Sequence, residues 1–323
     1  MSQVTIRAAR LHEHGKPLQV EAVERPEPGP GEVVVSMAYA GVNPLDRYVA
    51  LGRSQPDAPL PRILGTEGAG YLDGRPVVVH GSGVGLSRDG VFTESAVVPA
   101  DTVVDVPEGL DLAQAAAMGI AGVTAWRTVY DLARVEADDR VLVLGATGGV
   151  GSTIVSMVHA AGAEVWGQTG NAAKGEWLSE QGADRVVAAD AAGLVDAVRE
   201  LAPTVVFDPL GDGFTGAAVE ALSPTGRLVS FGTSADPRVE LNMQMVYRKS
   251  ITIYGYGGLI EPQERLHATL ADAMEALAAG RFRLVISDVL PLDDVLPLDD
   301  VNEAFRLLEH REVNGKLVLR LRD

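Results

Sequence analysis

Cysteine is absent from the 323 residues of the chain, which excludes disulfides, thiol nucleophiles and every cysteine-ligated zinc site. Histidine is scarce, and the six histidines are His12, His14, His80, His159, His267 and His310. None of them forms the H-x-x-x-H spacing that places two metal ligands on one face of a helix. His12 and His14 could meet on one strand face, but no third ligand is nearby, so a surface pair is the simpler interpretation. The sequence therefore predicts no bound metal.

Long apolar runs are also missing, since none approaches the roughly 18 residues that a membrane span needs. The first residues lack the basic and then apolar pattern of a signal peptide, and we expect a cytoplasmic protein. Positive charge is scarce: 27 Lys and Arg face 44 Asp and Glu, a net charge of −17. Such a surface repels phosphate backbones and anionic lipids, so we expect neither nucleic-acid nor membrane partners. A phosphate site would have to gather local Lys or Arg.

The composition, 46% hydrophobic and 22% charged, is that of a globular protein long enough for two domains. The first hundred residues predict strands and loops, and residues 111–133 predict one or two helices because they are rich in alanine and lack proline. Strand and helix then alternate. The candidate strands are residues 141–145, 164–168, 184–188, 204–208, 227–232 and 251–255. Because these runs are apolar without alternation, both faces of their sheet should be covered. The fold class is thus α/β, with a doubly wound, parallel, six-stranded sheet.

Two glycine-rich stretches compete as phosphate-binding loops. In VLVLGATGGVGS (141–152), an apolar strand leads into glycines and then into an uninterrupted helical run. That context gives a pyrophosphate the free N–H groups of a helix N-terminus. The second stretch, HGSGVGLS (80–87), is followed by no helix, and we expect a mobile loop beside a cleft. The predicted dinucleotide fingerprint is therefore residues 144–152, and its cofactor-binding residues are Ala146, Thr147, Gly148, Gly149, Val150 and Gly151.

The end of the second candidate strand bears on the choice of dinucleotide. NAD sites usually carry an acid there to bind the ribose hydroxyls, but this strand continues as VWGQTGNAAK (165–174), without an acid. Gln168, Thr169 and Asn171 can donate hydrogen bonds, and Lys174 adds a positive charge. A 2′-phosphate is tolerated where a carboxylate would repel it. The sequence predicts NADPH as the cofactor.

The hexamer VLPLDD occurs at 289–294 and again at 295–300. One repeat is too short for a solenoid, so we interpret it as a tandem duplication that lengthens a loop. The second copy supplies Asp299 and Asp300 as candidate N-caps for the helix that follows.

Several short motifs in order carry a resemblance to a known family. They are AGVNPLDRY (40–48), GTEGAG (65–70), DGVFTESAVVPA (89–100), AAAMGIAGVTAW (115–126), GATGGVG (145–151), FDPLG (207–211), GRLVSFG (226–232), ITIYGYG (251–257) and NGKLVL (314–319). With them, the chain resembles the zinc-free quinone oxidoreductases, the zeta-crystallin-like branch of the medium-chain dehydrogenase/reductases. The resemblance implies a GroES-like domain (1–120 and 261–323), a Rossmann domain (121–260), NADPH between them, and a homodimer.

Three departures from related patterns stand out. Zinc-dependent relatives carry Gly-His-Glu where this chain has Gly65-Thr66-Glu67, which agrees with the missing cysteines. The serine that quinone reductases place in the loop after the second strand falls near Gly170. Their tyrosine after the third strand is replaced by Ala188, Ala189 or Asp190.

The resemblance also implies site residues. Asn43 and Tyr48 should face the nicotinamide: the Asn43 amide would bond a ribose hydroxyl or a substrate carbonyl, and the Tyr48 phenol would bond an enolate or deliver a proton. Both have structural alternatives, because Asn43-Pro44 suits a helix N-cap and Tyr48 suits a core. Lys316 would add charge near the phosphates, and Asn314 would position the ring. The further implied cofactor contacts are Thr124, Thr169, Gly170, Gly232, Thr233, Tyr254, Gly255 and Tyr256.

Without a metal, the accessible chemistry is hydride addition to an activated acceptor. We therefore expect an NADPH-dependent oxidoreductase acting on a quinone or on a C=C bond conjugated with a carbonyl. An enoyl-thioester reductase of a polyketide or fatty-acid pathway is the alternative, although Ser54 stands where many such enzymes carry a tyrosine. A third possibility is a non-catalytic NADPH-binding protein.

Overall fold

The computed structural model describes residues 4–287 and 295–322, so the first copy of the repeated hexamer lies outside the described residues. The chain divides into two compact units. Unit 1 comprises Met1–Val123, Leu259–Ala279 and Val285–Asp323, and unit 2 comprises Thr124–Gly258 and Gly280–Leu284. The predicted domain limits near residues 120 and 260 stay a proposal.

Unit 2 is built on a six-stranded sheet of order β11-β10-β9-β12-β13-β14. All of its neighbouring strands pair in parallel. The strands are β9 (Arg140–Val143), β10 (Glu164–Thr169), β11 (Arg185–Ala188), β12 (Val205–Asp208), β13 (Arg227–Ser230) and β14 (Thr252–Gly255). The central strands β9 and β12 are fully buried over Val141–Val143 and Val205–Phe207, as continuous apolar runs require. The predicted α/β class and parallel sheet are confirmed.

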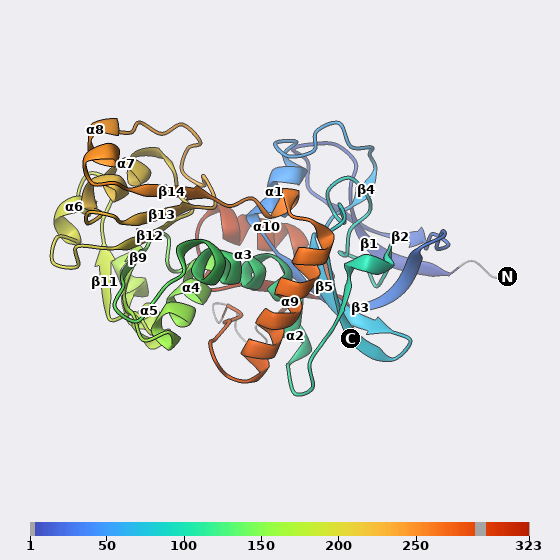
Figure 1. The fold of residues 1–323 in the computed structure, drawn as a ribbon. Helices are drawn as coiled ribbons and strands as arrows, with labels where there is room; N and C mark the ends of the chain where they lie inside the picture. The colour runs from blue at the N-terminus through green and yellow to red at the C-terminus, as the bar shows by residue number, and fades with distance from the viewer. Residues whose placement is uncertain (1–3, 288–294, 323) are drawn as a thin grey trace. The chain divides into compact units, whose positions relative to one another are not determined.

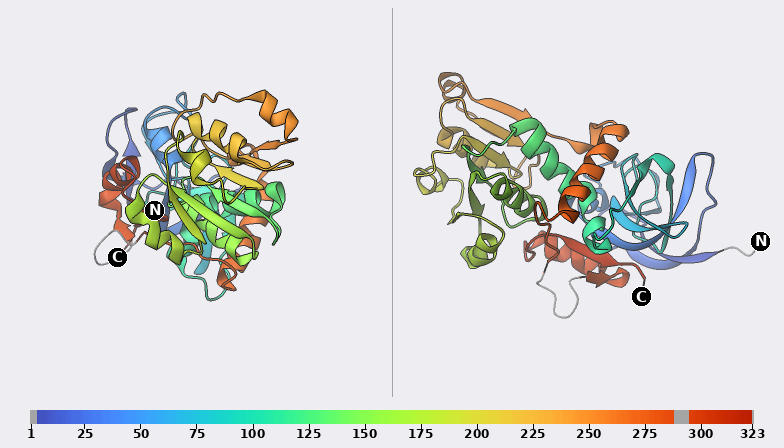
Figure 2. Two further views of the ribbon diagram at one scale, coloured as in Figure 1. Left: turned by 90° about the vertical axis from the view of Figure 1, so that its left-hand side faces the viewer. Right: turned by 60° about the horizontal axis from the view of Figure 1, so that its bottom comes forward.

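Helices line this sheet in Figure 1, and in the left panel of Figure 2 they are seen on both of its sides. They are α3 (Val123–Trp126), α4 (Gly149–Ala160), α5 (Gly175–Glu180), α6 (Leu194–Ala197), α7 (Asp212–Ala221) and α8 (Met243–Arg248). Helix α3 precedes the first strand of the sheet, and the crossover connections carry α4 to α8, as parallel strands require.

Unit 1 is rich in antiparallel strands. One sheet has the order β2-β1-β4, and a seven-stranded sheet has the order β15-β16-β3-β5-β6-β8, with β7 paired to β3. The strands are β1 (Thr5–Leu11), β2 (Gln19–Glu24), β3 (Glu32–Val42), β4 (Arg62–Ile63), β5 (Glu67–Leu72), β6 (Arg75–His80), β7 (Ser95–Pro99), β8 (Val103–Asp105), β15 (Val295–Pro297) and β16 (Leu317–Arg320). Strand β16 pairs with β3, so the last described strand and the N-terminal segment share one sheet.

The longer helices of unit 1 are α1 (Pro44–Ala50), α2 (Leu112–Ala116), α9 (Gln263–Ala278) and α10 (Val301–Glu309). The predicted helical region after residue 111 is helical but irregular, since π-helical turns at Met118–Gly122 and Arg127–Ala133 interrupt it. None of the helices in the described residues has the length and apolar character to cross a bilayer.

The second copy of the hexamer supplies β15 and the turn before α10. Asp300 stands at the N-cap position of α10, but its side chain makes no capping hydrogen bond. Asp299 forms an ion pair with Arg7 instead. The prediction of a side-chain cap is therefore wrong, because the Asp300 carboxylate bonds none of the free N–H groups and the Asp299 carboxylate is paired with Arg7.

The close approach of β3 and β5 depends on a glycine. A Cβ added at Gly70 would lie 2.1 Å from the Ser36 carbonyl oxygen, and backbone cannot move away as a side chain can. We expect Gly70→Ala to lower the free energy of unfolding by about 1–3 kcal/mol. Gly257→Ala, where nothing lies within 4 Å, is the control. Equal midpoints for the two variants in urea unfolding would contradict this account of the packing.

Candidate functional site

A buried charge network lies in unit 1. The Glu67 carboxylate is fully buried and the Lys316 side chain is 4% exposed, and Lys316 Nζ donates to Glu67 Oε1 over 2.6 Å. Asn43 joins both: its Nδ2 donates to Glu67 Oε1 over 2.8 Å, and its Oδ1 accepts from Lys316 Nζ over 2.6 Å. The backbone N–H of Ile120 donates to Glu67 Oε2 over 2.7 Å. Burial leaves these charges no water to bind, so each must be satisfied by the others.

Glycine makes room for this carboxylate. A Cβ at Gly41 would lie 2.4 Å from Glu67 Oε1 and 2.8 Å from the Ala116 carbonyl oxygen. At Gly41, β3 therefore presents no side chain toward Glu67. This leaves room for the carboxylate to reach Asn43, which directly follows β3.

Asp46 ties the start of α1 to the turn before β5. Its Oδ2 accepts from the backbone N–H of Asn43 over 2.8 Å, and its Oδ1 accepts from the N–H of Thr66 over 3.0 Å. The side chain is fully buried, and this burial raises the pKa of the Asp46 carboxyl to about 7. The nearby Glu67 carboxylate adds to the rise, while hydrogen bonds from the Asn43 N–H and the Thr66 side chain oppose it, as does the Lys316 ammonium.

His80 completes the cluster from the end of β6. Its Nδ1 lies 3.3 Å from the Thr66 carbonyl oxygen, and burial lowers the pKa of the imidazole, which favours its neutral form. Sequence reasoning gave no role to Asp46, Glu67 or His80. The only signal was an acid in each of the motifs NPLD and GTEG, and neither motif shows that the acid is buried.

The predicted site residues of unit 1 differ in whether their polar groups are already hydrogen-bonded. Both ends of the Asn43 amide are bonded within the network, and the Lys316 charge predicted for phosphates is paired with Glu67 instead. Asn314 Oδ1 is buried, with no hydrogen-bond partner in the described residues. Tyr48 lies half-buried on α1. Its hydroxyl makes no hydrogen bond within residues 4–287 and 295–322.

The second glycine-rich stretch supports this site by packing. A Cβ at Gly85 would lie 2.3 Å from the Gly65 carbonyl oxygen, and one at Gly90 would lie 2.4 Å from the same atom. Val84, directly before Gly85, is almost fully buried. The predicted loop beside a cleft is thus a packed segment, and its glycines allow it to approach the Gly65 backbone.

In unit 2 the predicted fingerprint joins β9 to α4. Gly148 is the N-cap residue, and the helix runs from Gly149 for 12 residues. A Cβ at Gly151 would lie 2.6 Å from the Gly145 carbonyl oxygen, so the helix can approach the strand only with glycine there. The strand, turn and helix N-terminus form the arrangement that binds a pyrophosphate.

Gln168 fixes the fingerprint turn and is not open to a ribose. Its Oε1 accepts from the Gly145 N–H over 3.0 Å, and its Nε2 donates to the Ala189 carbonyl over 2.6 Å. The side chain is 2% exposed. Gln168 therefore stabilises the turn, and it does not serve as the hydrogen-bond donor to the dinucleotide that the sequence suggested.

The loop after β10 carries the predicted phosphate-side residues. Thr169 is buried, Gly170 has open space around its Cα, and Asn171 Oδ1 accepts from the Ala173 N–H over 3.0 Å. Lys174 is half-buried, and desolvation lowers the pKa of its ammonium. An anion beside it would favour the charged form.

Most of the other predicted cofactor contacts of unit 2 lie at the carboxyl ends of neighbouring strands. Gly232 and Thr233 follow β13, Tyr254 and Gly255 end β14, and Tyr256 follows it. Dinucleotides bind at this edge of doubly wound sheets. Thr124 lies in α3, where its carbonyl accepts from the Thr128 hydroxyl over 2.7 Å. Unit 2 thus brings the fingerprint and the other predicted strand-end residues to one edge of the sheet.

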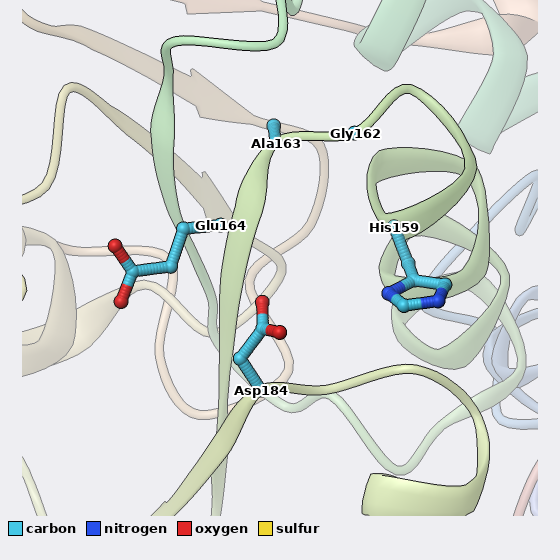
Figure 3. A pocket seen from close by; sticks show the side chains of 5 residues that line it. All are labelled: His159, Gly162, Ala163, Glu164 and Asp184. Atoms are coloured by element: carbon cyan, nitrogen blue, oxygen red, sulfur yellow. The ribbon is translucent and has the colours of Figure 1, made fainter.

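A surface pocket of about 420 Å³ lies elsewhere in unit 2. Its lining residues are His159, Gly162, Ala163, Glu164 and Asp184 (Figure 3). The pocket is at the amino end of β10 and the carboxyl end of α4, the wrong edge for a dinucleotide. Two carboxylates in its lining also disfavour phosphate, so we do not assign it to the cofactor.

Comparison with known proteins gives matches over nearly the whole chain. A family model described as zinc-binding dehydrogenase matches residues 149–278. The quinone oxidoreductase of Salmonella typhimurium is 28% identical, with 96% of this chain and 98% of that protein covered. A cobalt- and zinc-bound thermostable alcohol dehydrogenase from Pyrobaculum aerophilum is 30% identical with a TM-score of 0.83, over 98% of this chain and 100% of that one.

The chain belongs to the medium-chain dehydrogenase/reductase superfamily. The superfamily predicted from the motifs is thereby confirmed, and members of this superfamily bind a nicotinamide cofactor. A mycocerosic acid synthase-like polyketide synthase of Mycobacterium tuberculosis is also 31% identical over 94% of this chain. The chain spans 15% of the length of that polyketide synthase.

Zinc does not fit the residues of this chain, although the matching family model is described as zinc-binding. Cysteine is absent. Among the described residues, no three His, Asp or Glu side chains are grouped to hold a metal. The buried Glu67 already holds the Lys316 ammonium, and this cation would repel a second one. We assign no step of the reaction to zinc.

Asp46 makes stability depend on pH. An acid whose pKa rises on folding, here from 3.8 to about 7, contributes stability below pH 4 that is lost as the pH rises to about 7. The free energy of unfolding of the wild type, minus that of Asp46→Asn, should therefore be larger at pH 5 than at pH 8. Urea unfolding at both values measures it. The exposed Asp57→Asn is the control, and a pH-independent difference for Asp46 would count against the buried acid.

Proposed function

We propose that the protein is a metal-free, NADPH-dependent reductase of a quinone or of a C=C bond conjugated with a carbonyl. The observation that carries the proposal is the buried Lys316–Glu67 pair. It occupies the polar centre of unit 1 with a fixed ammonium rather than with metal ligands. An alcohol would have no Lewis acid from this donor set to help it lose a proton, so an acceptor that is already activated suits the site better.

The dinucleotide would be held by unit 2. Free N–H groups at the start of α4 suit the pyrophosphate, and the close packing at Gly151 leaves the turn open to it. When bound, NADPH supplies a hydride. Lys174 and the hydrogen-bonding groups of Thr169 and Asn171 would hold the 2′-phosphate, since this loop lacks the acid that binds a 2′-hydroxyl in NAD sites.

Tyr48 is the group that we propose for proton delivery. It lies at the end of α1, a helix whose first turn is fixed through Asn43 and Asp46. Its hydroxyl has no partner within the described residues. A phenol held in this way can bond a developing enolate oxygen or protonate its carbon. Asn43 would act through the network that fixes α1.

A second candidate is reduction of an enoyl thioester. The 31% identity to a segment of a polyketide synthase favours it. The chemistry is the same hydride addition to a conjugated carbonyl, so the same site serves both candidates. The acceptor distinguishes them.

The test is NADPH oxidation, followed by absorbance, with 9,10-phenanthrenequinone, with a simple enone and with crotonyl-CoA. Turnover of the quinone or the enone supports the proposal, whereas turnover of crotonyl-CoA alone supports the second candidate. Tight NADPH binding without turnover of any acceptor would leave a non-catalytic NADPH-binding protein and overturn both.

NADPH should bind at least tenfold more tightly than NADH, a difference of about 1.4 kcal/mol. Lys174→Ala should shrink that ratio because it removes the ammonium beside the 2′-phosphate. Titration calorimetry with both cofactors measures it, and Lys16→Ala at an exposed lysine is the control. Equal dissociation constants in the wild type would refute the preference.

Tyr48→Phe should lower kcat on an enone by roughly 10²-fold, the usual effect of losing one acid or oxyanion donor. Quinone reduction should fall much less, because water can protonate the more stable anion. The matched control is Tyr71→Phe, at a tyrosine that is 45% exposed on β5. Unchanged enone kinetics would remove Tyr48 from the mechanism.

A further inference from the structure

The amide of Gln168 joins two strand ends at the carboxyl edge of the unit 2 sheet. Its Oε1 accepts from the N–H of Gly145, which follows β9, and its Nε2 donates to the carbonyl of Ala189, which follows β11. These contacts measure 3.0 Å and 2.6 Å, and the side chain is 2% exposed. One buried amide at the end of β10 thus links the strands on either side of it.

Gln168 also holds the fingerprint turn through its backbone. The Ala146 N–H donates to the Gln168 carbonyl over 2.9 Å. Two successive N–H groups of the turn, those of Gly145 and Ala146, are therefore bonded to the same residue of β10. The regular pairing of β9 with β10 ends at Val143 and Gly167. Beyond that pair, Gln168 is the residue that keeps the turn against β10.

The conformation of this turn determines where α4 begins. Gly145 has φ +57°, in the left-handed region that glycine adopts readily, and its carbonyl accepts from the Gly148 N–H over 3.1 Å. Gly151 packs against the same carbonyl, since a Cβ there would lie 2.6 Å from it. A shift of Gly145 would therefore displace the first turn of α4. The free N–H groups of that turn are the ones that suit a pyrophosphate.

The sheet itself is paired without this amide. Strand β10 pairs with β9 over Glu164–Gly167 and with β11 over Trp166–Thr169 through backbone groups. Gly145 and Ala189 are only partly buried, so water can bond their polar groups when the amide is removed. The amide should therefore matter more for the geometry of the turn than for the stability of the sheet.

We propose that Gln168 is a positioning residue for the dinucleotide, an inference that rests on the cofactor binding proposed above. Its amide keeps the turn between β9 and α4 in its binding geometry before the dinucleotide arrives, so binding does not have to order the turn. Gln168 acts through the backbone of Gly145 and does not touch the cofactor. Its loss should weaken dinucleotide binding and leave the chemical step nearly unchanged.

The test compares Gln168→Met with Gln181→Met. Methionine is close to glutamine in size and removes both hydrogen bonds of the amide. Gln181 is the matched control: it is 9% exposed, and its Nε2 donates to the Trp177 carbonyl over 3.1 Å. It lies between α5 and β11, before the amino end of that strand, and so away from the carboxyl edge.

Titration calorimetry with NADP⁺ measures the effect on binding. Gln168→Met should raise Kd by roughly tenfold, as expected for the loss of hydrogen bonds that hold the turn. Gln181→Met should leave Kd unchanged. At saturating NADPH, the kcat of Gln168→Met should stay within about threefold of the wild-type value, because no group at the reacting atoms has changed.

Gln168→Glu examines the Ala189 end of the amide separately. An ionised carboxylate still accepts from the Gly145 N–H but turns a second oxygen toward the Ala189 carbonyl, whereas a protonated carboxyl donates to that carbonyl as the amide does. Burial favours the protonated form. The ratio of this variant's Kd to the wild-type Kd should therefore be high at pH 8 and fall toward one at pH 5.

A wild-type Kd for Gln168→Met would overturn the proposal, and so would equal weakening in Gln181→Met, because both changes would then act through general stability. Should Gln168→Met not fold, a pH-independent Kd ratio for Gln168→Glu would overturn it. A wild type that binds no NADP⁺ would remove the proposed cofactor together with this role. Binding of NADP⁺ without turnover of any acceptor would remove only the proposed reaction, and the Kd values would still decide the role of Gln168.

Discussion

The buried ion pair between Lys316 and Glu67 is the contact on which the architecture of unit 1 depends. Two charges without water are tolerable only when each finds bonded partners, and breaking such a pair typically costs about 3–5 kcal/mol. Here the partners come from distant parts of the chain: Glu67 begins β5, Lys316 precedes β16, and Ile120 belongs to the π-helical turn. One carboxylate therefore helps to set the positions of these strands and of the N-terminus of α1, the helix that carries Tyr48.

The same pair bears on what the site can do. A lysine ammonium supplies positive charge that has fixed bond directions and no empty coordination position, whereas a metal ion offers both charge and a place for the substrate. In this chain the Lys316–Glu67 pair thus stabilises the backbone of unit 1. In the proposed reaction, a hydroxyl group would then bond the substrate oxygen. The hydroxyl proposed for this role is that of Tyr48, which makes no hydrogen bond within the described residues.

The fold could be predicted from the sequence because its signals are local. Each strand of the parallel sheet is a short apolar run, and the fingerprint is one contiguous segment. The cluster could not be predicted in this way, since Asn43, Asp46, Glu67, His80 and Lys316 are spread over almost the whole chain. Their residue types suggest exposure, and only the three-dimensional structure shows them buried. Gln168 shows the same limit on a smaller scale: its position indicated a ribose donor, but its amide closes the turn beside it.

The bare backbone at Gly41 has an evolutionary consequence. Because the carboxylate of Glu67 fills the space that a side chain at Gly41 would need, a larger residue at Gly41 is not tolerated while Glu67 is present, and the loss of Glu67 or Lys316 alone leaves the other charge buried without its ion pair. A descendant that replaced the lysine alone would retain an isolated buried anion, and one that shortened the glutamate alone would retain both an isolated cation and a cavity beside a glycine. A change at this centre is therefore least costly when the lysine and the glutamate are replaced together.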